Sequence, residues 1–191
     1  MGLGNPGREH LNTRHNVGFR VAEELVERWR LGRAKDRFRG RLAEGRVPAA
    51  LADPMAVGPR VAVLRPQTYM NDSGRSVGPA RGTFKLPLER VLVVYDEIDL
   101  PFGEVRSRVG GGLAGHNGLK SLERGLGGAD FARVRVGVGR PDSSDPEIVS
   151  AWVLGNFRED EQQVRELIDR AAQEVERVVL GQALESNGRT G

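Results

Sequence analysis

The chain contains no cysteine, so it forms no disulfide, no thiolate metal site and no cysteine nucleophile. It has no apolar run near the ~18 residues that a membrane-spanning helix needs. Its first residues also lack the basic and hydrophobic regions of a secretory signal. We therefore expect a soluble cytoplasmic protein without a membrane partner. A chain of 191 residues suffices for one compact core, so we expect residues 1–191 to form a single domain.

Lysine is also scarce, because 26 of the 29 basic residues are arginine in a chain with a net charge of only +3. Guanidinium groups make bidentate contacts with phosphate, which weakly favours a nucleic-acid partner. An arginine-biased composition on an ordinary solvated surface explains the same count equally well. Only the positions of the arginines in the fold separate these alternatives.

Runs of β-branched residues alternate with helical patterns along the chain, which indicates an α/β fold. Strands are predicted at 60–66, 91–97 and 133–139, and an edge strand at 38–47 because its apolar content is low. Helices are predicted from residue 16 to 32 and at 73–84, 115–126, 148–154 and, as an amphipathic C-terminal helix, 159–180. The turn-rich stretch from Gly139 and the short helix after it are interpreted as a flap over 139–157.

The first residues, GLGNPG, fit the glycine pattern of a dinucleotide-binding loop. Such a loop needs a strand before it, a helix that begins at it and an acidic residue at the end of the next strand. None of these is present, since only Met1 precedes Gly2 and the helical pattern begins near Asn16. The sequence therefore argues against a nicotinamide enzyme. The glycines are interpreted as turn residues that leave the Asn5 side chain free.

Four polar residues lie where α/β proteins place their ligands. His15 stands at the start of a helix, whose dipole favours a neutral, proton-accepting imidazole. Asp96 follows the apolar run of a strand and can orient an imidazole and stabilise its cation. Asn71 and Asn117 can orient a water or donate to an oxyanion. Taken singly, each of these residues also fits a helix-start or turn role.

Other hydrolytic mechanisms lack their motifs. No serine lies in a nucleophile elbow, since the G-x-S-x-G string from Gly74 to Gly78 falls inside the predicted helix 73–84 and not at a strand-to-helix turn. The histidines do not stand at H-E-x-x-H spacing. A histidine base that acts on water is the simplest hydrolytic mechanism left.

The motifs of the chain resemble, in order, those of the bacterial peptidyl-tRNA hydrolase family: GLGNPG, TRHNVGF, PQTYMNDSG, DEIDLPFG, GGGLAGHNGLKS, FARVRVGVGRP and VLGNF. They cover most of the chain from Gly2 to Phe157. The resemblance implies a monomer with a single three-layer α/β/α domain and a mixed twisted sheet. It implies hydrolysis of the ester between a peptide and the tRNA 3′ end, which recycles tRNA from peptidyl-tRNAs released prematurely from ribosomes. No metal or cofactor is implied.

The resemblance also assigns roles to individual positions. His15 matches the catalytic base, and Asp96 matches the residue that stabilises its basic form. Asn5 matches the residue that distinguishes peptidyl-tRNA from unblocked aminoacyl-tRNA. The positions that match contacts to the 3′ end or the peptide are Tyr69, Asn71 and Asn117.

Two arginine pairs fall on segments expected to be extended, where residues two apart share a face. Arg106 and Arg108 match positions at which the family has basic residues near tRNA phosphate. Arg133 and Arg135 form a similar pair. We expect these arginines to bind tRNA in a salt-sensitive manner. Ordinary sheet-surface charge is the alternative for each.

The chain departs from the family at two places. Position 10, usually a substrate-binding tyrosine, is His10, whose ring can still stack or form a hydrogen bond. The family has a short apolar strand before GLGNPG, where this chain has only Met1. We therefore expect the fold to lack the family's first strand and the natural protein to begin several residues earlier, which the intact mass of natively expressed protein would test.

An RNA-binding relative that has kept this fold but lost hydrolysis is the alternative function. The retention of His15, Asp96, Asn71 and Asn117 favours the enzyme.

Overall fold

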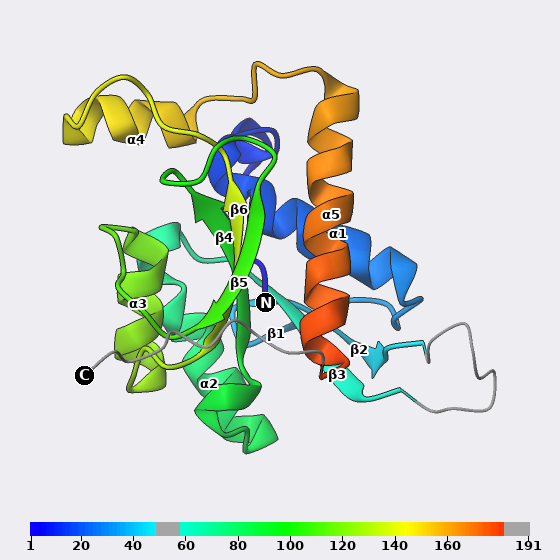
Figure 1. Cartoon of the computed structure of the whole chain (residues 1–191). Coiled ribbons are helices and arrows are strands. Elements are labelled where there is room, and N and C mark those ends of the chain that lie inside the picture. The colour runs from blue at the N-terminus through cyan, green and yellow to red at the C-terminus, as the bar shows by residue number, and fades with distance from the viewer. Residues whose placement is uncertain (49–57, 182–191) are drawn as a thin grey trace, which may run out of the picture.

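The structure, a computed structural model that describes residues 1–48 and 58–181, combines helices with strands (Figure 1). The predicted α/β class is confirmed. The strands are β1 (Lys35–Arg37), β2 (Gly40–Arg46), β3 (Arg60–Pro66), β4 (Leu92–Glu97), β5 (Val105–Val109) and β6 (Ala132–Gly137). The helices are α1 (Val17–Arg28), α2 (Gly74–Phe84), α3 (Asn117–Leu126), α4 (Pro146–Leu154) and α5 (Glu161–Val179). Short 3-10 helices are η1 (Arg8–His10), η2 (Arg14–Asn16), η3 (Met70–Asp72) and η4 (Leu88–Arg90).

The strands form two three-stranded sheets that the N-terminal residues join. β1, β2 and β3 pair antiparallel in that order, whereas β6 lies between a parallel β4 and an antiparallel β5. The Gly2 N–H donates to the Leu64 carbonyl of β3 at 3.2 Å, and the Leu3 N–H donates to the Val94 carbonyl of β4 at 2.9 Å. Residues 1–3 thus stand between β3 and β4, with one β-bridge from Gly2 to Val94 in place of a regular strand.

A cavity of about 1100 Å³ continues from Met1 between β3 and β4. Its lining includes Val63 of β3, Leu92 of β4 and Trp29 of α1. Among the described residues no strand pairs with both β3 and β4 along this stretch. The ladder is therefore continuous only where residues 1–3 bridge it.

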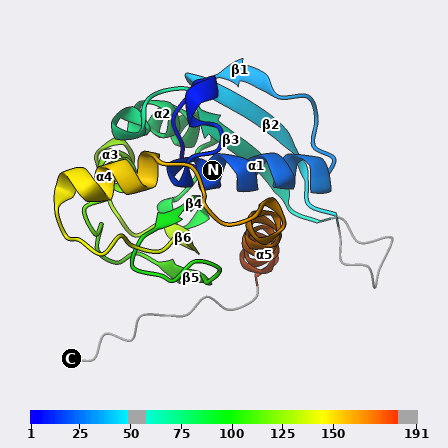
Figure 2. The same ribbon diagram turned by 90° about the horizontal axis from the view of Figure 1, so that it is seen from above.

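Helices cover both faces of the sheets and make three layers (Figures 1 and 2). α1 and α5 pack on one face, where Val134 and Val136 of β6 are buried among their apolar side chains. α2 and α3 pack on the other face, where Leu119 and Leu122 meet Tyr95 of β4. Each buried side chain of this size stabilises the fold by ~1.5–3 kcal/mol. The two cores hold β4 rigidly between them, and β4 carries Asp96.

One strand prediction is wrong. The segment 38–47 contains β2, which lies between β1 and β3 and is the central strand of its sheet. Its apolar content is low because only part of the strand, including Leu42 and Ala43, is buried. The charged β1 forms the edge instead, as is common for an edge strand that avoids further pairing.

The last two helices begin at capping residues. The Asp160 carboxylate accepts from the Gln163 N–H at 2.8 Å and the Gln163 side chain accepts from the Asp160 N–H at 3.3 Å, a capping box at the start of α5. Asp145 accepts from the Glu147 N–H at 2.8 Å ahead of α4, and Pro146 occupies the first turn. No residue of α4 is buried, and Figure 1 shows the helix projecting from the body of the protein.

Candidate active site

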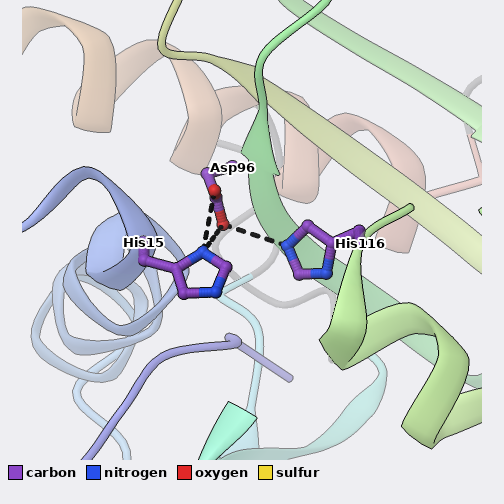
Figure 3. A group of neighbouring side chains, drawn as sticks. All are labelled: His15, Asp96 and His116. Carbon is purple, nitrogen blue, oxygen red and sulfur yellow. Dashed lines mark hydrogen bonds and ion pairs between the residues drawn. The ribbon is translucent and has the colours of Figure 1, made fainter. Parts of the chain in front are cut away.

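Three side chains from separate elements meet at the carboxyl end of β4 (Figure 3). His15 comes from η2 directly before α1, Asp96 is near the end of β4, and His116 precedes α3. Strand ends of an α/β sheet are where its clefts form. The structure therefore brings together His15 and Asp96, the pair that the sequence predicted across 81 positions.

The Nδ1 atom of His15 lies 2.9 Å from each carboxylate oxygen of Asp96, which is buried. Because a carboxylate only accepts, Nδ1 carries the proton and Nε2 keeps its lone pair. Nε2 has no hydrogen-bond partner among the described residues, and the His15 side chain is 12% exposed. The ring thus keeps a basic nitrogen on the side away from Asp96.

The charges of the pair support each other. Burial lowers the pKa of His15, but the charge of Asp96 and its hydrogen bond outweigh burial and leave that pKa raised above its ordinary value. Burial raises the pKa of Asp96, but its contacts with His15 and His116 outweigh burial and hold that pKa well below its usual range. The sequence predicted that the helix start would favour a neutral imidazole, whereas the adjacent Asp96 carboxylate favours the imidazolium and leaves the pKa of His15 raised.

His116 is the functional candidate that sequence reasoning missed. Its Nε2 lies 3.1 Å from Asp96, while its Nδ1 accepts from the N–H groups of Gly118 and Leu119 at 3.1 and 3.3 Å. The side chain therefore caps α3, and the cap fixes the tautomer with the proton on Nε2. The signal in the sequence was a histidine at the start of a helix, one of only three in the chain.

The same three side chains offer ligand atoms within 4.8 Å of one another, the spacing of a metal site. Their hydrogen bonds disfavour that use. Nδ1 of His15 and Nε2 of His116 both carry protons that point at Asp96, and moving the proton of His116 to Nδ1 would break the cap of α3. The cluster is therefore arranged to hold a carboxylate and a base.

Asn5 lies beside this cluster with most of its polar groups engaged. Its backbone N–H donates to Oδ1 of Asn16 at 2.8 Å, and its carbonyl accepts from Nδ2 of Asn16 at 2.9 Å. Its own Oδ1 accepts from the Met70 N–H at 2.8 Å. That bond assigns the oxygen of the amide, so Nδ2 is the group left to meet a ligand. Among the described residues Nδ2 has no partner.

The other predicted substrate residues lie on the elements around the cluster. η3, which carries Asn71, packs against α3, whose first residue is Asn117. Both asparagines are exposed, and Tyr69 is 63% exposed. His10 ends η1 with its Nε2 3.7 Å from the Glu9 carboxylate. Within the described part of the chain, Tyr69, Asn71 and Asn117 make no side-chain hydrogen bonds, so they can turn toward a ligand.

The four predicted arginines line one face of β5 and β6, since Arg106 is paired with Arg135 and Arg108 with Arg133. Arg133 is fully buried and donates to the carbonyls of Gly112 and Ala129 at 2.7 and 2.9 Å. The prediction that Arg133 contacts tRNA is therefore wrong, because the loops on either side of α3 cover it.

The remaining arginines differ in what they offer to a partner. Arg135 donates to the buried carboxylate of Glu97 at 3.1 Å and is only 17% exposed. Arg108 is half-buried. The Arg106 side chain is 58% exposed and paired with Glu104 at the surface. Arg106 is thus the member of the set best placed to meet phosphate.

Arg14, the neighbour of His15, fastens the segment 139–157 to the site. Its backbone N–H donates to the Gly155 carbonyl at 3.0 Å and its Nη1 donates to the Asn156 carbonyl at 2.6 Å. The guanidinium stacks 3.9 Å from the ring centre of Trp152. The end of α4 is therefore tied to the turn that carries His15.

Comparisons with known proteins agree with one another. The family model described as peptidyl-tRNA hydrolase matches residues 1–189. The peptidyl-tRNA hydrolase of Gloeobacter violaceus is 44% identical over 187 residues, 97% of this chain and 88% of that protein. The enzyme of that name from Geobacter sulfurreducens is 47% identical over 161 residues, 84% of this chain and 77% of that one.

A solved structure extends the likeness to the fold. The crystal structure of peptidyl-tRNA hydrolase from Acinetobacter baumannii is similar with a TM-score of 0.81 and 36% identity, over 95% of this chain and 87% of that one. With the site geometry described above, these matches lead to one conclusion: the chain belongs to the peptidyl-tRNA hydrolase family.

Proposed function

We propose that the protein hydrolyses the ester bond of peptidyl-tRNA with His15 as the general base. One observation carries this assignment: the buried Asp96 carboxylate holds the Nδ1–H of His15 and leaves Nε2 as an unpaired basic nitrogen. This is the tautomer that a base needs in order to take a proton from water. The family membership supplies the substrate class.

The chemistry then needs only groups of this chain and a water molecule. Nε2 of His15 removes a proton from the water, and the oxygen attacks the ester carbonyl. Asp96 stabilises the imidazolium that results. An amide N–H₂ of Asn71 or Asn117 donates to the developing oxyanion. Collapse of the intermediate breaks the ester C–O bond and passes the proton of the imidazolium to the tRNA 3′ oxygen. The peptide leaves as a carboxylic acid, which ionises to its carboxylate by giving its proton to solvent. The scheme uses no cofactor.

Asn5 selects peptidyl-tRNA over aminoacyl-tRNA in this proposal. Its Oδ1 is engaged by the Met70 N–H, so the group it offers is the Nδ2 donor. A blocked substrate has an acyl carbonyl that accepts from this donor, whereas an unblocked one has an ammonium, which only donates. The unpaired donor and the buried positive charge both disfavour the unblocked substrate.

The rest of the substrate meets the residues around the site. Tyr69 and His10 offer rings for stacking on the 3′ end, which is worth ~1–3 kcal/mol per base. Arg106 contacts tRNA phosphate, and the less exposed Arg108 and Arg135 on the same face add positive charge next to it. The segment 139–157, attached through Arg14, acts as a lid over the site, with α4 as its moving part. Residues 1–191 form a single domain that ends with the amphipathic helix α5. The stacking role of Tyr69 and the phosphate role of Arg106 are supported by the exposure of these two side chains.

We also propose that the protein acts as a monomer in the cytoplasm, where its substrate is released. Among the described residues no helix is long and apolar enough to cross a membrane. Light scattering on purified protein, with and without tRNA, tests the monomer.

The decisive experiment incubates the protein with N-acetylaminoacyl-tRNA and follows the release of free tRNA. We expect release by the wild type and a loss of at least about a hundredfold in His15→Ala. Tight tRNA binding without release by the wild type would instead indicate a binding protein that has lost hydrolysis.

A further inference from the structure

Asn16 is buried at the position before α1, where a polar side chain ordinarily caps the helix. Here it caps no helix N–H. Both ends of its amide bind the backbone of Asn5 instead, with Oδ1 accepting from the Asn5 N–H and Nδ2 donating to the Asn5 carbonyl. The side chain of Asn16 therefore contributes no cap to α1, and its role in the structure is to bind the backbone of Asn5.

The bonds around Asn5 leave one arrangement. Asn16 fixes both backbone polar groups of Asn5, and the Met70 N–H fixes its side-chain oxygen. Turning the Asn5 amide over would place its N–H₂ against the Met70 N–H, donor against donor. The Asn5 Nδ2 donor therefore points in a single direction for as long as Asn16 holds the backbone.

Asn16 also directly follows His15 in η2, so the amide pair joins the loop that carries Asn5 to the turn that carries the base. A shift of ~1 Å between a binding group and a reacting group is enough to cost catalysis heavily. One side chain thus sets the distance between the residue that recognises the acyl group and the residue that activates water.

We infer that Asn16 is a positioning residue for substrate discrimination, which aims the Asn5 amide donor at the acyl carbonyl of a blocked substrate. The inference rests on the proposed role of Asn5. Asn16 touches neither the ester nor the water. It acts on the ratio between hydrolysis of blocked and unblocked substrates, through the two backbone bonds that it makes to Asn5.

The test measures kcat/KM of Asn16→Ser with N-acetylaminoacyl-tRNA and with the same aminoacyl-tRNA left unblocked. The serine hydroxyl is shorter than the amide and has one polar atom in place of two, so it cannot make both bonds to the Asn5 backbone. We therefore expect the blocked-to-unblocked ratio to fall about tenfold. The pH at half-maximal rate stays that of the wild type, because His15 and Asp96 keep their contacts. Asn12→Ser is the matched control, the same substitution at an exposed position of the same segment, and keeps the wild-type ratio.

A folded Asn16→Ser variant with the wild-type ratio overturns the inference if Asn5→Ala lowers the ratio in the same assay. If Asn5→Ala also leaves the ratio unchanged, the role of Asn5 is wrong and the inference falls with it. Hydrolysis of the blocked substrate by the wild type tests the proposed function separately, so the two failures are distinguishable.

If Asn16→Ser does not fold, a measurement on the wild-type protein tests the inference instead. The side-chain amide protons of Asn16 are followed by NMR while a non-hydrolysable amide analogue, 3′-(N-acetylaminoacyl)amino-3′-deoxyadenosine, is added. We expect protons that exchange slowly and shift with the acetylated analogue more than with its unacetylated counterpart. Fast exchange, or equal shifts with both, overturns the inference.

Discussion

Asp96 accepts hydrogen bonds from two histidines whose roles differ. His15 keeps an open ring nitrogen, whereas both nitrogens of His116 are occupied, one by Asp96 and one by the start of α3. One imidazole can therefore act as a base, and the other holds the carboxylate in place. The difference follows from where each ring sits relative to a helix.

The pH profile of hydrolysis should report the support that Asp96 gives to His15. The base is active when neutral, and the raised pKa of His15 places the rise of kcat/KM above its ordinary value of about 6.5. In Asp96→Asn burial remains and the charge is gone, so the pKa of His15 falls and the rise moves to lower pH. The rate at the plateau drops by at least about a hundredfold. An unmoved rise in the pH profile would contradict the assignment.

Two substitutions at His116 separate its bonds. Serine can cap α3 and cannot reach Asp96, whereas alanine does neither. We expect kcat/KM to fall about tenfold in both variants. The free energy of unfolding should fall only in His116→Ala, by ~1 kcal/mol, because only this variant loses the cap of α3. Rate assays and denaturant titrations measure the two effects. Wild-type activity in His116→Ser would show that the bond to Asp96 is dispensable.

At the scale of elements, Arg14 makes η2 and the end of α4 one unit. Its side chain is buried between Trp152 and the Asn156 carbonyl, although α4 itself has no buried residue. The helix is therefore held at one end only. If the segment 139–157 acts as the proposed lid, we expect it to pivot at the end next to His15.

Arg14→Lys tests that attachment, because lysine keeps the charge and loses the planar fork that stacks and bonds at once. We expect faster hydrogen exchange over residues 149–157 and a lower kcat/KM. Arg158→Lys is the control, since Arg158 is exposed and lies farther from the same ring, 5.7 Å from its centre. Equal protection of the segment in both variants would refute the attachment.

The success of sequence reasoning also varied by element. Runs of β-branched residues predicted β3 and β4, and the helical spacing of apolar residues predicted α5, whose buried side chains form one stripe. Alternation along β6 correctly placed Arg133 and Arg135 on one face, but it carries no information on which loops cover that face. His116 was missed for the same reason, because its role depends on the end of β4 lying beside the start of α3. Local patterns predict faces, and packing decides what the faces meet.

At the scale of the whole molecule, the arginines divide between structure and surface. Arg14 and Arg133 are buried, whereas Arg106 on β5 and Arg37 on β1 are exposed at opposite edges of the strand order. Arginine content alone therefore could not decide the partner. If tRNA phosphate contacts only the β5 edge, substitutions at the two edges should affect tRNA binding differently.

Salt titrations of tRNA binding make that separation measurable. Removal of one phosphate contact lowers the slope of log K against log salt by about 1. We expect Arg106→Ala to weaken binding and lower the slope by about that amount. We expect Arg37→Ala to change neither. Equal slopes for the two variants would place the tRNA elsewhere on the surface.

The bridge that residues 1–3 make between the two sheets also governs the order of assembly during synthesis. These residues are synthesised long before their partners Leu64 and Val94. At ~5–20 residues per second the N-terminal segment waits for several seconds before β4 exists to receive it. Asp96 arrives with that same strand. The junction between the sheets and the contact between His15 and Asp96 are therefore completed in one late step of translation.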